Sequence, residues 1–425
     1  MATTQRKTAK TEKTITGAVC PFCSLLCDDL TVKTTESSIS LLRNTCPNAK
    51  QGFDKLVTEH TAPSVGQSET KLHTAVSATA EIIAQSQQVA FGGLGTDVDA
   101  LRTLYKLAAK CGAVIDHMHS ENALANVSVM QTLGWYNTTL SEVKNRADVI
   151  LIVGADCKNK YARFVEKILE PTSAISAAAR KSRRVIYLGP RKNAPSSKKL
   201  PVEIIPCEQS EIATLLSVLR AQVAKKSLQT ELPQHKNLAA LAEQLRQAKY
   251  ANIVWSANAL APSQSRLCIE TISRLVGQLN ETTRAAGLPL GGDEGGMSAQ
   301  QVSSWLSGFP LRVSYAQGIP AYDPRENNIE TMLSKGGVDC LVWVDAFGRS
   351  MPPKLPSAVR LIYIGHPQIG KQLNADVCIP VGLPGVHHSA RLVRTDAVVT
   401  VPLDRLYRTK LPSVKSVADS LLAEV

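Results

Sequence analysis

The feature that most constrains the fold is a series of short apolar runs spread along the chain. They lie at 89–95, 148–153, 251–255, 339–344 and 359–364. Runs of this kind are typical of parallel strands that are covered by helices on both faces of a sheet. After the first run, residues 97–110 form an amphipathic pattern with Leu101, Leu104, Leu107 and Ala108 on one face, which predicts a helix. The alternation of strands and helices indicates an α/β protein.

Size and composition set the outer limits. A chain of 425 residues is too long for one ordinary core, so two or three α/β lobes are expected. No apolar run reaches the roughly 18 residues that a membrane-spanning helix needs, so no membrane association is expected. The first 13 residues are polar and basic and lack the apolar region of a secretory signal. Ten cysteines without such a signal favour a reducing compartment, and we expect the cytoplasm.

Four cysteines near the N-terminus form the clearest chemical motif. Cys20, Cys23 and Cys27 lie within eight residues, and Cys46 follows at a distance. A compact set of three thiols plus one distant thiol is a common way to hold a 4Fe–4S cluster. Structural zinc more often uses two compact pairs of ligands, so the spacing favours iron–sulfur over zinc. A loop with four cysteines and no metal is the remaining alternative.

The net charge of +12 is concentrated in part in one short segment. Its basic residues are Lys181, Arg183, Arg184, Arg191, Lys192, Lys198 and Lys199. The base-stacking aromatic residues of single-strand binders and a recognisable reading helix are both missing, so no nucleic acid is expected as a partner. The segment is either a solvated basic face or a contact surface for an acidic partner or a polyanionic ligand.

The order of the motifs resembles that of molybdopterin and tungstopterin oxidoreductases, and more narrowly of the B-type subunit of formylmethanofuran dehydrogenase. Residues 20–29, which end in paired aspartates, resemble that subunit's cluster loop. Residues 139–148 are close to its "TLGEVKNRADV" segment. Further similar segments follow at 305–310, 317–324, 375–380 and 394–396. The resemblance spans about residues 17 to 410 in the family's order.

This resemblance implies a domain organisation. A disordered basic tail is expected over 1–16, followed by a cysteine-rich module of the iron–sulfur type over 17–59. Residues 60–139 and 286–425 should join in one Rossmann-like α/β lobe, with 140–285 inserted as a second α/β lobe. The β-barrel at the C-terminus of longer pterin enzymes is not expected.

The sequence departs from the family at the residues that surround the pterin metal. Asn122 lies where the family has the cysteine or selenocysteine ligand, and Ala123 where it has a histidine. An amide is a poor ligand for a soft metal that prefers sulfur. His117 and His119 lie nearby, and we interpret them as ordinary polar loop residues.

Two further departures lie elsewhere in the sequence. Gly291 replaces the arginine and Asp293 replaces the histidine of the family's "LPMRGHYNV" motif. This exchange puts negative charge where an anionic substrate should bind, and we expect repulsion. Residues 153–164 replace the pterin-contacting "WGCNPMEAHPRH" stretch. No molybdopterin or tungstopterin is therefore expected, and the four aligned positions are interpreted as degenerate.

A related bacterial complex, the formyltransferase/hydrolase complex, exchanges formyl groups between tetrahydromethanopterin and a methanofuran-like carrier and releases formate. The resemblance implies that this chain is its non-redox structural component, with partners of the A, C and D type. The carrier's polyglutamate tail would be a polyanionic target for the basic segment. Two alternatives remain, a redox-active B-type subunit of formylmethanofuran dehydrogenase and a 4Fe–4S electron-transfer subunit. The chain itself is expected not to be catalytic.

Overall fold

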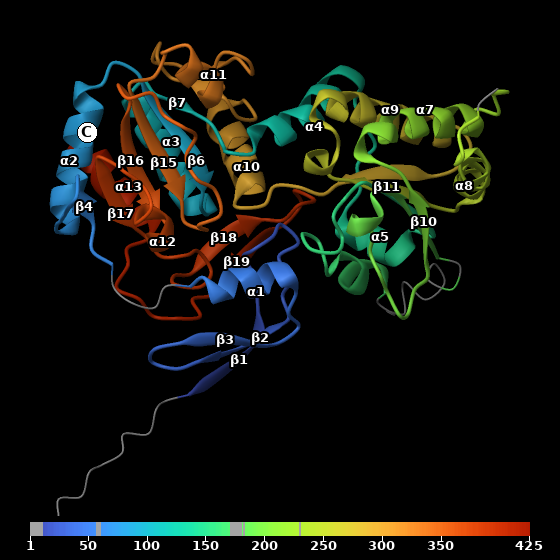
Figure 1. Cartoon of the computed structure of the whole chain (residues 1–425), viewed down its shortest axis with the longest axis horizontal. Helices are drawn as coiled ribbons and strands as arrows, with labels where there is room; N and C mark the ends of the chain where they lie inside the picture. The colour runs from blue at the N-terminus through green and yellow to red at the C-terminus, as the bar shows by residue number, and fades with distance from the viewer. Residues whose placement is uncertain (1–11, 57–60, 171–180, 182, 229–230) are drawn as a thin grey trace, which may run out of the picture.

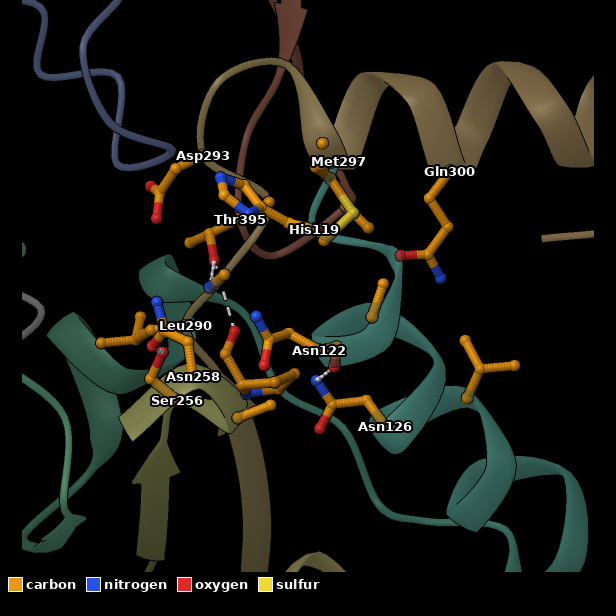
Figure 2. A pocket seen from close by; sticks show the side chains of 18 of the residues that line it. His119, Asn122, Asn126, Ser256, Asn258, Leu290, Asp293, Met297, Gln300 and Thr395 are labelled. Carbon is orange, nitrogen blue, oxygen red and sulfur yellow. Dashed lines mark hydrogen bonds between the residues drawn. The ribbon is translucent and has the colours of Figure 1, made fainter. Parts of the chain in front are cut away.

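The computed structural model describes residues 12–56, 61–170, 181, 183–228 and 231–425. Figure 1 shows two α/β lobes side by side, with a small N-terminal module below the junction between them. The α/β class predicted from the sequence is confirmed. Among the described residues, no helix is long and apolar enough to span a bilayer.

The N-terminal module is a three-stranded antiparallel sheet followed by one short helix. The sheet consists of β1 (Lys13–Ala18), β2 (Leu30–Thr34) and β3 (Ile39–Arg43), and the helix is α1 (Pro47–Asp54). The predicted tail over 1–16 is therefore too long at its C-terminal end, because β1 already begins at Lys13 and pairs with Thr34 of β2. The rest of the predicted tail, residues 1–11, lies outside the described residues.

One lobe is built on a nine-stranded sheet whose central strands are parallel. Its strand order is β14 (Ala321–Tyr322), β13 (Val313–Ser314), β7 (Val114–Ile115), β6 (Val89–Gly95), β15 (Cys340–Asp345), β16 (Arg360–Gly365), β17 (Val377–Pro380), β4 (Ser64–Val65) and β5 (Ser68–Glu69). Four helices cover one face, namely α2 (Leu72–Gln85), α3 (Val98–Lys110), α10 (Gly296–Ser307) and α13 (Val414–Glu424). The other face carries α11 (Ile329–Ser334) and α12 (Pro367–Gly370). Both faces of the central strands are thus buried, as the apolar runs predict.

The other lobe contains a fully parallel five-stranded sheet. Its order is β10 (Val202–Pro206), β9 (Arg184–Gly189), β8 (Val149–Val153), β11 (Ala251–Trp255) and β12 (Ala285–Pro289). One face is covered by α7 (Ile212–Val223), α8 (His235–Gln247) and α9 (Ser265–Leu279). The opposite face packs against α5 (Leu140–Arg146), against the π-helical turn η1 (Val165–Leu169) and against the cysteine loop. Short 3₁₀ turns lie at η2 (Arg191–Asn193), η3 (Gln209–Glu211), η4 (Ala257–Ala259) and η5 (Pro262–Gln264).

Helix α4 (Ser120–Leu133) crosses from one lobe to the other. Its sequence lies within 60–139, but it packs against α9, and its Val129 belongs to the core of the five-stranded lobe. Figure 1 shows α4 beside α9, and α10 between the two lobes. The hairpin of β18 (Ala390–Val393) and β19 (Thr400–Leu403) lies close to the module. These elements bring residues from three parts of the chain to the junction.

Candidate functional site

The structure gathers the four cysteines around one small cavity. The backbone amide of Cys20 donates to the carbonyl of Cys27 at 2.8 Å, which closes the loop that carries the first three thiols. Cys46 caps the N-terminus of α1, where its Sγ accepts from the amide of Ala49 at 3.4 Å. All four residues line this cavity, whose volume is about 10 Å³. Residues up to 26 positions apart in the sequence (20 to 46) therefore meet at one point.

Burial keeps Cys20, Cys23 and Cys27 protonated in the absence of a metal. Desolvation raises the pKa of Cys20 to about 12 and that of Cys27 to about 11. It also raises the pKa of Cys23 well above its ordinary value. None of the four thiols is in a disulfide. A metal that binds them would have to displace their protons, because thiolates are the ligands.

The donor set suits a cluster better than a single ion. Within the described part of the chain, no three histidine, cysteine or acidic side chains are placed to bind one metal ion. Tetrahedral zinc requires four ligands at about 2.0–2.3 Å from one centre. In a cubane each thiolate binds a different iron, so four separate thiols around a shared cavity are the donor set that such a cluster uses. The 4Fe–4S cluster itself stays a prediction.

The paired aspartates anchor the cysteine loop to the five-stranded lobe. The buried guanidinium of Arg163 donates to the two carboxylate oxygens of Asp29 at 2.7 and 2.8 Å. It also donates to Glu166 at 3.0 Å. The hydrogen bonds from Arg163 hold the pKa of Asp29 below its usual value. Lys167 adds an ion pair with the more exposed Asp28 at 3.1 Å.

A second and larger cavity lies where the two lobes meet. Its volume is about 210 Å³, and it is bounded by the first turns of α4 and α10 and by the loops that follow β11 and β12. The carboxyl ends of parallel strands are where α/β proteins usually bind ligands. Asn122, Ala123, Gly291 and Asp293 all line this cavity. The aligned positions from two separate motifs are thus brought together in space.

Asp293 does not act as the repulsive charge expected from the sequence. Its carboxylate accepts from the amide of Ser24 at 2.9 Å, from the hydroxyl of Tyr161 at 2.9 Å and from Nζ of Lys160 at 3.0 Å. Burial opposes its ionisation, but Lys160 and these hydrogen bonds outweigh burial and lower its pKa. Because Lys160 neutralises Asp293, the expected repulsion of anions is absent. Ser24 lies in the cysteine loop, so Asp293 connects the two cavities.

The carboxylate of Glu294 and the rings of His117 and His119 also have hydrogen-bond partners. Nε2 of His119 contacts a carboxylate oxygen of Glu294 at 2.8 Å. Nδ1 of His117 accepts from the amide of His119 at 3.0 Å, so its Nε2 is the protonated nitrogen and donates to the carbonyl of Glu294 at 3.2 Å. Burial lowers the pKa of His117 to about 3, which keeps it neutral. Both rings therefore have structural roles in this arrangement.

The family-like segment 394–396 connects all three parts of the molecule. The amide of Thr395 donates to the carbonyl of Ser24 in the module at 2.9 Å. Its hydroxyl accepts from the amide of Gly291 at 3.0 Å. The carboxylate of Asp396 accepts from the amide of Leu140 at 3.0 Å, at the start of α5. The motif pointed to this segment, but only the structure shows that it joins the lobes beside the cavity.

The basic segment needs one correction. Arg183 is buried and donates to the carbonyls of Ala147 and Lys144, both at 2.9 Å, so it stabilises the C-terminal end of α5. The sequence could not distinguish it, because its neighbours are also basic. The exposed members are Lys181, Arg184, Arg191, Lys192, Lys198 and Lys199.

Sequence reasoning missed the polar lining of the large cavity. Six amide side chains contribute to it, namely Asn122, Asn126, Asn137, Asn258, Gln300 and Gln301. Only Asn122 was singled out from the sequence. The others carry no motif of their own, and no pattern in the sequence links them.

Comparison with known proteins gives a consistent result, although no family model matches the chain. The B-type subunit of a tungsten-containing formylmethanofuran dehydrogenase 2 from Methanocaldococcus jannaschii is 25% identical over 404 residues, 91% of this chain and 92% of that protein. The B-type Fhc subunit of the formyltransferase/hydrolase complex from Methylorubrum extorquens is 29% identical over 312 residues, 73% of this chain and 82% of that protein.

Two solved structures extend the comparison. One chain of the formyltransferase/hydrolase complex FhcABCD from Methylorubrum extorquens, crystallised with methylofuran, superposes with a TM-score of 0.72 at 25% identity. The match covers 85% of this chain and 98% of that chain. Acetylene hydratase from Pelobacter acetylenicus has a TM-score of 0.59 at 10% identity over 96% of this chain and 69% of its own, and this match shows the fold alone.

The fold is therefore that of the molybdopterin-oxidoreductase type, with Rossmann-like α/β lobes and an N-terminal cysteine module. Within this class, the chain is a relative of the B-type subunits of formylmethanofuran dehydrogenase and of the formyltransferase/hydrolase complex. The resemblance stated from the sequence is confirmed.

Proposed function

We propose that this chain is the non-redox structural component of a formyltransferase/hydrolase complex. The complex would serve one-carbon metabolism from formaldehyde to formate, with tetrahydromethanopterin and a methanofuran-type carrier. The similarity to the B-type Fhc subunit in both sequence and structure supports membership in such a complex. In this role the two lobes form a rigid body to which catalytic subunits of the A, C and D type bind.

One observation carries the proposal that the metal–pterin site has been lost. Of the described residues that line the large cavity, none is a cysteine, and Asn122 lies at the position aligned with the metal ligand. A neutral amide is a weaker ligand for such a metal than the thiolate or selenolate that the family has at this position. Gly291 provides no side chain at the position aligned with the arginine. This pocket therefore lacks both the cysteine-type metal ligand and the arginine that the family has at the aligned positions.

We propose that the four thiols around the cysteine cavity bind a 4Fe–4S cluster, which Cys20, Cys23, Cys27 and Cys46 would hold. When bound, such a cluster can carry electrons or act as a purely structural cross-link. We propose the structural role, because the module is small and a metal centre would tie its loop to α1. Arg163 and Lys160 line the same cavity and place positive charge beside the thiolates.

The exposed basic residues and the free cysteines support a proposal for the binding partners and the cellular location of this protein. The exposed basic residues between 181 and 199 offer a contact for the polyglutamate tail of the carrier. The ten cysteines are all free, which agrees with a reducing cytoplasm. No nucleic acid and no membrane is proposed as a partner.

Two other functions remain as alternatives. An active oxidoreductase would need Asn122 or His119 as the metal ligand, and His119 is already paired with Glu294 at 2.8 Å. An electron-transfer subunit would need a redox-active cluster in the cysteine cavity, and the convergence of four thiols there favours this alternative over the first.

The test uses the chain with its natural partners. An affinity tag on this chain should recover subunits with formyltransferase and formate-releasing activities, because the proposed role is to hold them together. The Asn122→Ala complex should keep both activities within a few-fold of the parent. A loss of about a thousandfold, the scale of removing a catalytic group, would overturn the structural role.

A further inference from the structure

A separate cavity lies between α7 and α8, in the five-stranded lobe. Figure 1 shows α8 at the outer end of this lobe, away from the module and from the junction of the lobes. The cavity has a volume of about 390 Å³. It is lined by the end of α7, by the residues that follow that helix and by one face of α8. It shares no residue with the cavity at the junction.

Basic side chains dominate the lining of this cavity. The described residues that form it include Lys225, Lys226, Arg246 and His235, and none of them is acidic. Among the described residues, the carboxylate that pairs with these cations is that of Glu243, which does not line the cavity. Three cations against one carboxylate leave an excess of two positive charges. Such an excess favours an anion that carries about two charges.

The end of α7 does not account for all of this charge. Nη1 of Arg246 donates to the carbonyl of Gln222 at 2.9 Å and thereby satisfies the last turn of α7. The amide of Lys226 donates to the carbonyl of Ala221 at 2.9 Å. The amide of Lys225 donates to the carbonyl of Gln222 at 3.0 Å. These two backbone bonds form the Schellman motif that closes a helix, so neither lysine side chain is needed there.

The backbone of Lys225 has a conformation that favours glycine. Its φ of 54° lies in the left-handed region, and the residue at this position of a Schellman motif is usually glycine. A lysine at this position therefore costs conformational free energy. Strain of this kind occurs most often where the side chain has a functional role. Within the described residues, the ammonium groups of Lys225 and Lys226 have no ion-paired or hydrogen-bonded partner.

The donors around the cavity match a phosphate group. Lys225, Lys226 and Ser227 are consecutive and offer two ammonium groups and one hydroxyl. A phosphate monoester carries about −1.5 to −2 charges near pH 7 and has three acceptor oxygens, whereas a carboxylate carries a single charge. The dianion therefore matches the excess of two positive charges. Leu228 and Ala239 add an apolar wall on which the organic part of an ester can lie.

We propose that the cavity between α7 and α8 binds the phosphate dianion of a small molecule. Lys225 and Lys226 are the charged contacts, and Ser227 donates a hydrogen bond to a phosphate oxygen. The dianion can be supplied by a phosphate monoester or by inorganic phosphate. This site is independent of the proposed assembly role, because it lies outside the junction of the lobes.

The experiment is isothermal titration calorimetry of the purified complex at low ionic strength with phenyl phosphate, inorganic phosphate and benzoate. The double variant Lys225→Gln, Lys226→Gln removes both charges from exposed side chains. The control variant Lys371→Gln, Lys410→Gln removes two charges from exposed positions outside the cavity. Loss of two charge-assisted contacts should weaken phosphate binding by at least about tenfold.

A second cavity variant keeps both lysines. Ala239→Glu adds a carboxylate to the lining at an exposed position of α8, where glutamate is a good helix former. Repulsion between this carboxylate and the dianion should also weaken binding by about tenfold.

The proposal is supported if the parent and the control variant bind phenyl phosphate more tightly than benzoate and both cavity variants bind it about tenfold more weakly. Tighter binding of phenyl phosphate than of inorganic phosphate then identifies an ester as the ligand, and the reverse identifies the free ion. No binding by the parent, equal binding of phenyl phosphate and benzoate, unchanged binding by either cavity variant, or an equal loss in the control would overturn the proposal.

Discussion

At the scale of single residues, Asp293 has the clearest consequence for stability. It is buried, and its three partners come from the cysteine loop and from the segment after β8. Asp293→Asn keeps the shape but leaves Lys160 without its counter-charge, and Lys160 is about one-third exposed. We expect a loss of about 1–3 kcal/mol in the free energy of unfolding. Chemical denaturation of the variant and the parent measures this loss.

The same residue predicts a dependence on pH. The folded-state pKa of Asp293 lies below its ordinary value of 3.8. The stability that the ionised Asp293 carboxylate gives to the fold is therefore fully present well above pH 3.8. It is lost as the pH falls through the folded-state pKa. The stability difference between the parent and Asp293→Asn should shrink as the pH falls below about 4. A difference that stays constant from pH 7 to pH 3 would contradict this assignment.

His117 gives a second pH effect. It arises because burial disfavours the charged ring, whereas at Asp293 the partners favour the charged carboxylate. Its folded-state pKa of about 3 lies below the ordinary 6.5, so the unfolded chain binds the proton more readily and stability falls as the pH drops below 6.5. His117→Gln should remove this contribution, so its stability relative to the parent should rise by about 1.4 kcal/mol per pH unit lowered between pH 6.5 and 3. His73→Gln, at an exposed position of α2, is the matched control variant.

At the scale of elements, the junction of the cysteine loop with η1 depends on one ion pair between the buried Arg163 and the partly exposed Asp29. Asp29→Asn removes the carboxylate that binds both arms of Arg163, which is itself buried. We expect a cost of about 2–4 kcal/mol and faster proteolysis of the module, because Arg163 loses a charged partner. Asp28→Asn is the matched control. Its carboxylate is largely exposed and pairs with Lys167, so its loss should cost under about 1 kcal/mol.

The elements also show what could be predicted from sequence. The strands predicted over 89–95, 251–255 and 339–344 are found, because their apolar runs are short, continuous and bounded by polar residues. The placement of α4 could not be predicted, since its packing on α9 depends on the spatial relation of two lobes.

Asp293 was interpreted as an uncompensated charge because its partners Lys160 and Ser24 are remote in sequence. Arg183 was assigned to the surface because its neighbours in the sequence are also basic, although its side chain is buried.

At the scale of the whole molecule, the cysteine module should depend on its metal. Cys23→Ser should abolish bound iron in anaerobically purified protein, lower the melting temperature and weaken retention of the partner subunits. The control is Cys157→Ser, because Cys157 is equally buried but does not line the cysteine cavity. If the parent carries no iron and Cys23→Ser melts and assembles like the parent, the four thiols are packing groups.

The central claim is that this large α/β body supports a formyl-transferring complex without a metal–pterin centre of its own. It depends on the cavity at the junction of the lobes, which Asn122 and Gly291 line, and on the prediction from the resemblance that these two positions carry the metal ligand and the arginine in the dehydrogenases. The most direct measurement is the molybdenum, tungsten and pterin content of the complex purified without air through this chain. The account predicts less than a few per cent of any of them per chain. Molybdenum or tungsten together with pterin, near one equivalent per chain, would contradict it.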